Sequence, residues 1–205
     1  IQHINLHNNA ISHIKSGSFA GYENLKTVTL SGNPIENIEA ETFSRTHNLT
    51  LAIDADATRL LNPQELGRGS EIWVFGEGAS ASVNSSMCAS AKAAGVKWVG
   101  RRSIASSDLK LVRTNKNSSA HACKSEGGRQ IFSISSQHDH EAAKGAISSF
   151  GIEFDELYVV GAKSSSDLLG FFEWEDGTPW VFENWSKTYI SPTYQHAYLS
   201  GYKVY

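Results

Sequence analysis

The first part of the chain repeats its pattern of apolar and polar positions every 24 residues, so that Ile4 aligns with Val28 and Leu6 with Leu30. Further matched pairs are Asn9 with Asn33, Ile11 with Ile35, Ile14 with Ile38, Phe19 with Phe43 and Leu25 with Leu49. Within each copy apolar and polar side chains alternate, and in a strand alternation places the apolar ones on one face. The pattern therefore predicts one strand in each copy, with Leu30 pointing inward and Thr29 outward.

The two segments at residues 4–11 and 28–35 resemble the strand-plus-asparagine segment of the leucine-rich repeat. This resemblance implies an α/β solenoid in which stacked coils bury a common core, because one coil cannot bury its own apolar face. The amide of Asn33 can then bridge main-chain groups of successive coils that would otherwise be buried unpaired. Phe19 and Phe43 are expected to fill the convex side of the coils as core residues.

Strand-like segments continue beyond the regular repeat, at residues 51–53, 72–76 and 96–100. The last two also fit an offset of 24, which would align Ile72 with Val96 and Phe75 with Val99. Between them, residues 90–94 favour a helix that ends at Gly95. We therefore predict a first domain at residues 1–103, composed of leucine-rich repeats with irregular C-terminal repeats or a cap.

A different order of elements begins near residue 107 and resembles a C-type-lectin-like domain, which implies an α+β fold for residues 107–205. The resemblance rests on the order of several segments along the chain. These segments are residues 120–131 with Cys123 and a Gly pair, residues 134–141, residues 157–162, residues 172–179 and the Asn184-Trp185 pair.

Two of these segments carry a local structural mechanism. Ser136 can cap a helix, and Asp139 three residues later approximates a capping box. In the strand that follows, Phe172 and Trp174 fall on one face, Glu173 and Glu175 fall on the other, and Asp176-Gly177 predicts a turn. We expect the two glutamates to be exposed.

The resemblance implies that the second domain is C-terminally incomplete and lacks its closing strand, so the chain is interpreted as a fragment. It also implies that Cys123 forms a disulfide with a cysteine outside this segment. A bond between Cys88 and Cys123, the two cysteines present, stays open as an alternative.

Composition excludes several functions. The net charge of −3 gives no basic surface for a nucleic-acid partner, and no apolar run is long enough for a membrane span. We find none of the local motifs typical of hydrolases, zinc enzymes or phosphate-binding loops, so we predict that the chain is not an enzyme. The run His138-Asp139-His140-Glu141 contains metal-ligand types, but the two histidines point to different sides of a helix. No metal site is predicted.

Calcium is possible but not favoured as a cofactor. Sugar-binding C-type lectins hold this ion with oxygen-bearing triplets around a loop proline and near the end of the domain. The corresponding positions here are Ser191-Pro192-Thr193 and Lys203-Val204-Tyr205, which lack carboxylates. We therefore predict a loop that binds its ligand without cofactors, through Glu183, Asn184, Tyr189, Ser191, Pro192, Thr193, Tyr194 and Gln195.

Four Asn-x-Ser/Thr sequences make Asn48, Asn84, Asn117 and Asn184 candidates for glycosylation. They favour an extracellular protein, either secreted or the ectodomain of a membrane receptor. The leading hypothesis is recognition of an extracellular protein or carbohydrate by the lectin-like domain, with the concave strand face of the repeats as a second surface. Alternatives are a calcium-dependent lectin with atypical ligands and a structural spacer in a large receptor. Polycystin-like receptors combine the same modules.

Overall fold

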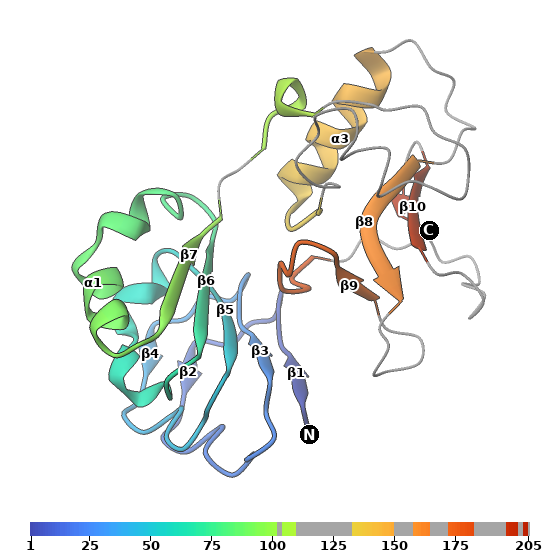
Figure 1. Ribbon diagram of the computed structural model, residues 1–205. Helices are drawn as coiled ribbons and strands as arrows, with labels where there is room; N and C mark the ends of the chain where they lie inside the picture. The colour runs from blue at the N-terminus through green and yellow to red at the C-terminus, as the bar shows by residue number, and fades with distance from the viewer. Residues whose placement is uncertain are drawn as a thin grey trace. The chain divides into compact units, whose positions relative to one another are not determined.

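Five short parallel strands of the N-terminal half form one sheet, in which strand order follows chain order as β1-β3-β5-β6-β7 (Figure 1). The computed structural model describes residues 1–101, 104–109, 133–149, 158–164, 172–182, 196–200 and 203–204. The chain divides into two compact units, Ile1–Arg102 and Ser103–Tyr205. Each unit is considered by itself.

The first unit alternates these strands with short segments on the other side of the sheet. Its strands are β1 (His3–Asn5), β2 (His13–Ile14), β3 (Thr27–Thr29), β4 (Asn37–Ile38), β5 (Thr50–Asp54), β6 (Glu71–Phe75) and β7 (Lys97–Gly100). Its helices are the 3-10 turns η1 (Ala57–Leu60), η2 (Pro63–Glu65) and η3 (Ala81–Asn84) and the α-helix α1 (Ser86–Ala93). Strands β2 and β4 pair in a small parallel sheet that the sequence pattern did not predict.

The register of the first two coils agrees with the predicted repeat, since Ile4 pairs with Val28. The offset of 24 predicted for the last two strands is wrong. Ile72 pairs with Trp98 and Trp73 with Val99, which is an offset of 26. Strands β5, β6 and β7 extend the same parallel sheet, with a spacing that differs from 24 residues.

The coil between β6 and β7 contains the only α-helix described in the first unit. Helix α1 starts at Ser86, four residues before the predicted start, because the Ser85 hydroxyl accepts the Cys88 N–H at 3.1 Å and caps it. It ends as predicted at Gly95, whose φ of 77° suits a residue without Cβ. The Val96 N–H then donates to Ala91 O at 2.9 Å, which closes a Schellman motif.

Inward strand residues and the opposite segments share one apolar core. Leu30 is 1% exposed, as predicted, and the Phe19 and Phe43 rings stack with centroids 5.3 Å apart. Thr29 points outward as predicted but is only 2% exposed. It lies between the neighbouring strands β1 and β5, and its hydroxyl donates to Asn5 Oδ1 at 2.5 Å. An outward position in the middle of this sheet is therefore not free to accept any substitution.

Asn33 joins the first two coils through main-chain groups, as predicted. Its Nδ2 donates to Leu6 O and Leu30 O, both at 2.8 Å, and its Oδ1 accepts the Ile11 N–H at 3.1 Å. The equivalent Asn9 donates to Leu6 O and to His7 O but is exposed. Asn33 is thus a hydrogen-bond partner for main-chain groups inside the protein, whereas Asn9 makes its hydrogen bonds at the surface, where water can replace them.

The second unit contains a four-stranded antiparallel sheet in the order β11-β10-β8-β9. Its described elements are η4 (Ser106–Asp108), α3 (Gln137–Ser149), β8 (Tyr158–Ser164), β9 (Phe172–Trp174), β10 (His196–Ser200) and β11 (Lys203–Val204). Strands β8 and β9 match predicted segments, and β10 and β11 form a pair that the sequence pattern did not predict.

The two cysteines differ in what the structure shows. Cys88 belongs to α1, and its free thiol is buried in the core of the first unit. Cys123 lies outside the described residues, as does the whole segment 120–131 on which part of the C-type-lectin resemblance rests.

Candidate functional site

We call the side of the five-stranded sheet that lies opposite the solenoid core the outer sheet face. This face carries two complete rows of side chains, and each strand contributes one side chain to each row. Register places His3, Thr27, Thr50, Glu71 and Lys97 in the first row. The second row is Asn5, Thr29, Ala52, Trp73 and Val99. Parallel strands thus present side chains from residues that are far apart in sequence as neighbours on one surface.

A charged and aromatic cluster occupies the β6–β7 end of this face. Lys97 Nζ lies 2.8 Å from Glu71 Oε1, and the Trp73 indole N–H donates to Glu71 Oε2 at 3.0 Å. Burial by itself raises the pKa of Glu71, but the hydrogen bonds from Lys97 and Trp73 outweigh it and hold that pKa below its ordinary value. The Lys97 side chain is 62% exposed, so the pair adds little to stability, and its fixed geometry is available to a partner.

The β1 end of the outer sheet face is neutral and polar. Asn5 Oδ1 is the acceptor for the Thr29 hydroxyl and lies 2.5 Å from the His7 ring nitrogen Nδ1. These contacts orient the Asn5 amide across two strands. The face therefore changes in chemistry along its length, from amide and hydroxyl groups at β1 to a carboxylate, an indole and an ammonium at β6 and β7.

A partly buried carboxylate marks the end of β5. Asp54 Oδ2 accepts the Gly32 N–H at 2.6 Å, which links the third coil to the second. Gly32 has a φ of 73°, and a Cβ there would lie 2.1 Å from Asn8 Oδ1, so glycine is needed at this turn. Burial raises the pKa of Asp54 above its ordinary value, while the Gly32 hydrogen bond acts in the opposite direction.

This raised pKa leads to a pH-dependent prediction for Asp54→Asn. The folded state binds a proton at Asp54 more readily than the unfolded chain does, so the charged carboxylate lowers stability at pH values above the folded pKa. We expect the variant to melt about 2 °C higher at pH 7, a small shift because the group is partly exposed, and asparagine can still accept the Gly32 N–H. The gain should shrink as the pH falls through the raised pKa towards the ordinary value of 3.8. Melts from pH 3.5 to 7.5 measure it.

The matched control is Asp56→Asn, which removes an exposed carboxylate two residues away. It should change the melting temperature less, because Asp56 acts on Asp54 only through charge. A gain for Asp54→Asn that did not depend on pH would contradict the assignment to protonation.

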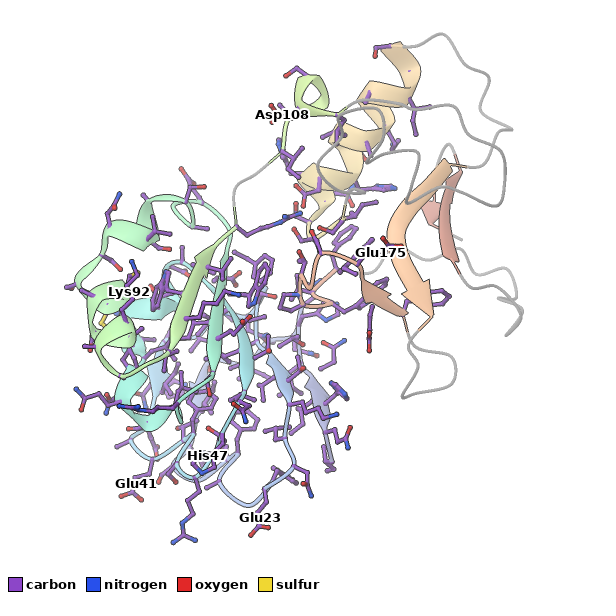
Figure 2. The ribbon with its side chains drawn as sticks, viewed as in Figure 1. Glu23, Glu41, His47, Lys92, Asp108 and Glu175 are labelled. Carbon is purple, nitrogen blue, oxygen red and sulfur yellow. The ribbon has the colours of Figure 1, made fainter. Side chains whose placement is uncertain are left out.

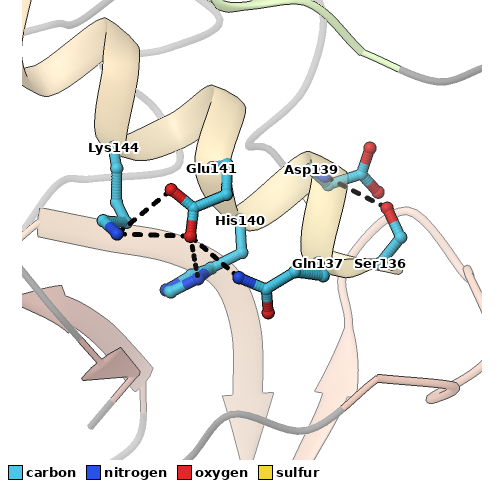
Figure 3. A network of polar contacts seen from close by, with 6 residues as sticks. All are labelled: Ser136, Gln137, Asp139, His140, Glu141 and Lys144. Carbon is cyan, nitrogen blue, oxygen red and sulfur yellow. Dashed lines mark hydrogen bonds and ion pairs between the residues drawn. The ribbon is translucent and has the colours of Figure 1, made fainter.

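At the start of α3 in the second unit, the predicted Ser136 cap is confirmed, but the capping box differs from the predicted one (Figure 3). The Ser136 hydroxyl accepts the Asp139 N–H at 3.0 Å. Asp139 does not reach back to the Ser136 N–H, however. Its Oδ2 accepts the Ser135 N–H at 3.0 Å and the Ser135 hydroxyl at 2.6 Å, one residue earlier than a regular capping box.

The two histidines at this helix point to different sides, as predicted. His138 is exposed and His140 is buried, and burial lowers the pKa of His140. Beside them, Lys144 Nζ donates to both carboxylate oxygens of the exposed Glu141, and Gln137 donates to one of them (Figure 3). Across the described part of the chain, no three His, Cys, Asp or Glu side chains are grouped to hold a metal ion.

The turn after β9 also matches its predicted pattern. Trp174 is buried while Glu173 and Glu175 are exposed, so the two glutamates lie on a solvated face. Gly177 has a φ of 77° and its N–H donates to Trp174 O at 3.0 Å. The adjacent Asp176 accepts the Ser133 hydroxyl at 2.6 Å, which connects this turn to the chain before α3. These contacts hold the turn in place.

The loop predicted to bind ligand lies outside the described residues, so its arrangement is not part of the site described above. This applies to Glu183, Asn184, Tyr189, Ser191, Pro192, Thr193, Tyr194 and Gln195, and to Asn117 among the glycosylation candidates. Asn48 and Asn84 are described and exposed. The Glu71, Trp73 and Lys97 cluster was not predicted, although alternation around the inward Ile72 would have placed Glu71 and Trp73 on the outer sheet face.

The ordered parallel strands, the stacked phenylalanines and the bridging asparagine together define a repeat solenoid of the α/β class. A family model described as leucine rich repeat matches residues 1–54, so this part of the chain is a leucine-rich-repeat segment. No curated protein matches the chain. Leucine-rich repeats generally mediate protein–protein recognition. None of the described helices combines the length and apolar character needed to span a membrane.

Proposed function

We propose that this chain is an extracellular recognition module that binds a protein partner on the outer sheet face of its leucine-rich-repeat unit. The observation that carries this proposal is the Glu71, Trp73 and Lys97 cluster, which is held by hydrogen bonds on a face built from five strands. Leucine-rich repeats generally bind proteins, and this face is the surface that the described fold offers for that purpose.

The chemistry of the cluster suits a protein partner. Preoriented charged groups favour correct partners and disfavour wrong ones. Trp73 is buried, and its indole N–H holds the Glu71 carboxylate in a fixed position. The two ends of the outer sheet face differ in chemistry, with neutral amide and hydroxyl groups at β1 and charged groups at β6 and β7. A partner with complementary charge opposite Lys97 and Glu71 is therefore favoured in one orientation over the reverse.

For the second unit, we propose a C-type-lectin-like recognition domain whose ligand is a protein or a carbohydrate. Support comes from the order of its segments along the sequence, from the helix capped by Ser136 and from the Asp176-Gly177 turn after a strand with a buried Trp174. Because Ser191-Pro192-Thr193 and Lys203-Val204-Tyr205 lack carboxylates, we infer that its recognition does not require calcium. The absence of recognisable catalytic motifs in the sequence supports a binding role over an enzymatic one.

Charge reversal on the two sides of the solenoid tests the proposed binding face. Lys97→Glu places a second carboxylate beside Glu71 on the outer sheet face and should weaken partner binding about tenfold, which corresponds to about 1.4 kcal/mol. Lys92→Glu makes the same charge change on α1, away from the strands, and should leave binding unchanged (Figure 2). Both variants and the parent chain are measured by surface plasmon resonance against a panel of purified extracellular domains.

Equal loss of binding in both variants would argue for a nonspecific charge effect and against the outer sheet face. Binding that is unaffected by Lys97→Glu would place the interface elsewhere, with the second unit as the alternative. Repeating the measurement with a calcium chelator tests the second unit, since a loss of binding on chelation would favour a calcium-dependent lectin.

A further inference from the structure

We propose that Asn84 carries an N-linked glycan, on the side of the solenoid that faces away from the outer sheet face. The inference rests on the extracellular location in the proposed function, but not on the identity of the partner. Four sequences along the chain fit the acceptor pattern, and two of their asparagines, Asn48 and Asn84, lie among the described residues. The surroundings of these two asparagines differ.

Asn84 is the last residue of η3, and its surroundings leave room for a sugar. Its side chain is exposed and, among the described residues, no hydrogen bond or ion pair involves it. Ser86, which supplies the hydroxyl that the acceptor pattern requires, is also exposed. The residue between them, Ser85, caps α1, so the sequence lies at a turn between two helices and not in a strand.

The position of η3 determines where the glycan would lie. The indole N–H of Trp98, an inward residue of β7, donates to Ser82 Oγ at 2.9 Å. A Cβ at Gly100, the other inward β7 position, would lie 3.1 Å from Cγ1 of Val83 in η3. Both contacts place η3 on the core side of the sheet. A glycan on Asn84 therefore leaves Glu71, Lys97 and the rest of the outer sheet face uncovered.

Asn48 has less freedom. Its φ of 52° is left-handed, and its Oδ1 lies 2.2 Å from the place that a Cβ on Gly69 would occupy, so its amide lies against the Gly69 backbone. The next residue, Leu49, is fully buried, and its N–H donates to Ser70 Oγ at 3.0 Å. The following residue, Thr50, already belongs to β5. We therefore restrict the proposal to Asn84.

The reaction is an ordinary group transfer. A new bond forms between Asn84 Nδ2 and the anomeric carbon of an oligosaccharide, and the bond from that carbon to a lipid pyrophosphate breaks. The lipid pyrophosphate leaves with the electron pair of the broken bond, and Nδ2 loses one proton to a base of the host transferase. The lipid-linked oligosaccharide is the only co-reactant, and no oxidant or reductant takes part.

Peptide mass spectrometry can test this residue separately from the other acceptor sequences. Trypsin places Asn84 in residues 69–92 and Asn48 in residues 46–59, because no lysine or arginine interrupts either peptide. The full chain is secreted from a eukaryotic cell behind a cleavable leader, and its glycans are removed enzymatically in heavy-oxygen water. We expect the peptide 69–92 to contain labelled aspartate at position 84.

Asn84→Gln and Ser86→Ala should each abolish the label on peptide 69–92, whereas Asn48→Gln should leave it in place. An unmodified peptide 69–92 from the secreted parent chain, or a label that persists in Ser86→Ala, would overturn the proposal. Partner binding by Asn84→Gln is measured in parallel. Because that variant lacks the sugar and keeps the outer sheet face, a failure of the glycan assignment can be distinguished from a failure of the proposed function.

Discussion

Leu30→Asp is expected to lower the free energy of unfolding by about 4 kcal/mol or more, enough to unfold the first unit if its stability is ordinary. Leu30 is 1% exposed and lies in the shared apolar core, so an aspartate there would be buried without a partner for its charge. Urea unfolding followed by circular dichroism measures the loss.

The control for this variant is Asn24→Asp, which adds the same carboxylate to an exposed position shortly before β3. It should change the free energy of unfolding by no more than about 0.5 kcal/mol. Similar midpoints for the two variants would mean that Leu30 does not belong to the core, and the register of the repeat would have to be revised.

Asn33→Ala is expected to cost about 3 kcal/mol, through hydrogen bonds and not through apolar packing. The variant removes the side-chain partner of Leu30 O and of the Ile11 N–H, whereas Leu6 O keeps its hydrogen bond from Asn9. A buried polar group without a partner typically costs about 1 to 3 kcal/mol. Asn33 is 7% exposed, so water can replace these bonds only in part. The same urea titration measures this variant.

Asn9→Ala provides a closely matched comparison, since Asn9 occupies the equivalent position one coil earlier and also donates to two carbonyl oxygens. Because Asn9 is exposed, water can replace its bonds, and we expect a cost below about 1 kcal/mol. If the two alanine variants lost equal stability, the bridge between coils would not be the source of the effect.

The regular part of the solenoid could be predicted because its information is local. The first two coils carry residues of the same kind at matching positions, so aligning Ile4 with Val28 is sufficient to find the register of β1 and β3. The C-terminal end of α1 near Gly95 and the N-terminal cap of α3 at Ser136 were predictable for the same reason. Each cap depends on a few consecutive residues. The bridging role of Asn33 followed from the repeat pattern together with the requirement that buried main-chain groups be paired.

The register of β6 and β7 could not be obtained in this way. A shift of two residues keeps every side chain on its own face, so the apolar pattern cannot distinguish an offset of 24 from the observed 26. The correct offset depends on how η3, α1 and the Gly95 turn pack, which is tertiary information. With the predicted offset, Lys97 would have been placed beside Trp73. The observed offset places it beside Glu71, so the ion pair of the candidate site could not be predicted from the pattern.

Coil length in this solenoid varies on one side only, and this has an evolutionary consequence. Equivalent strand positions are separated by 24 residues from His3 to Thr27, 23 from Thr27 to Thr50, 21 from Thr50 to Glu71 and 26 from Glu71 to Lys97. The strands nevertheless stay paired in a continuous sheet, because the segments behind it absorb the difference as turns, 3-10 turns or a helix. Insertions and deletions in those segments can therefore accumulate between descendants of one gene, while the order of side chains on the outer sheet face is inherited unchanged.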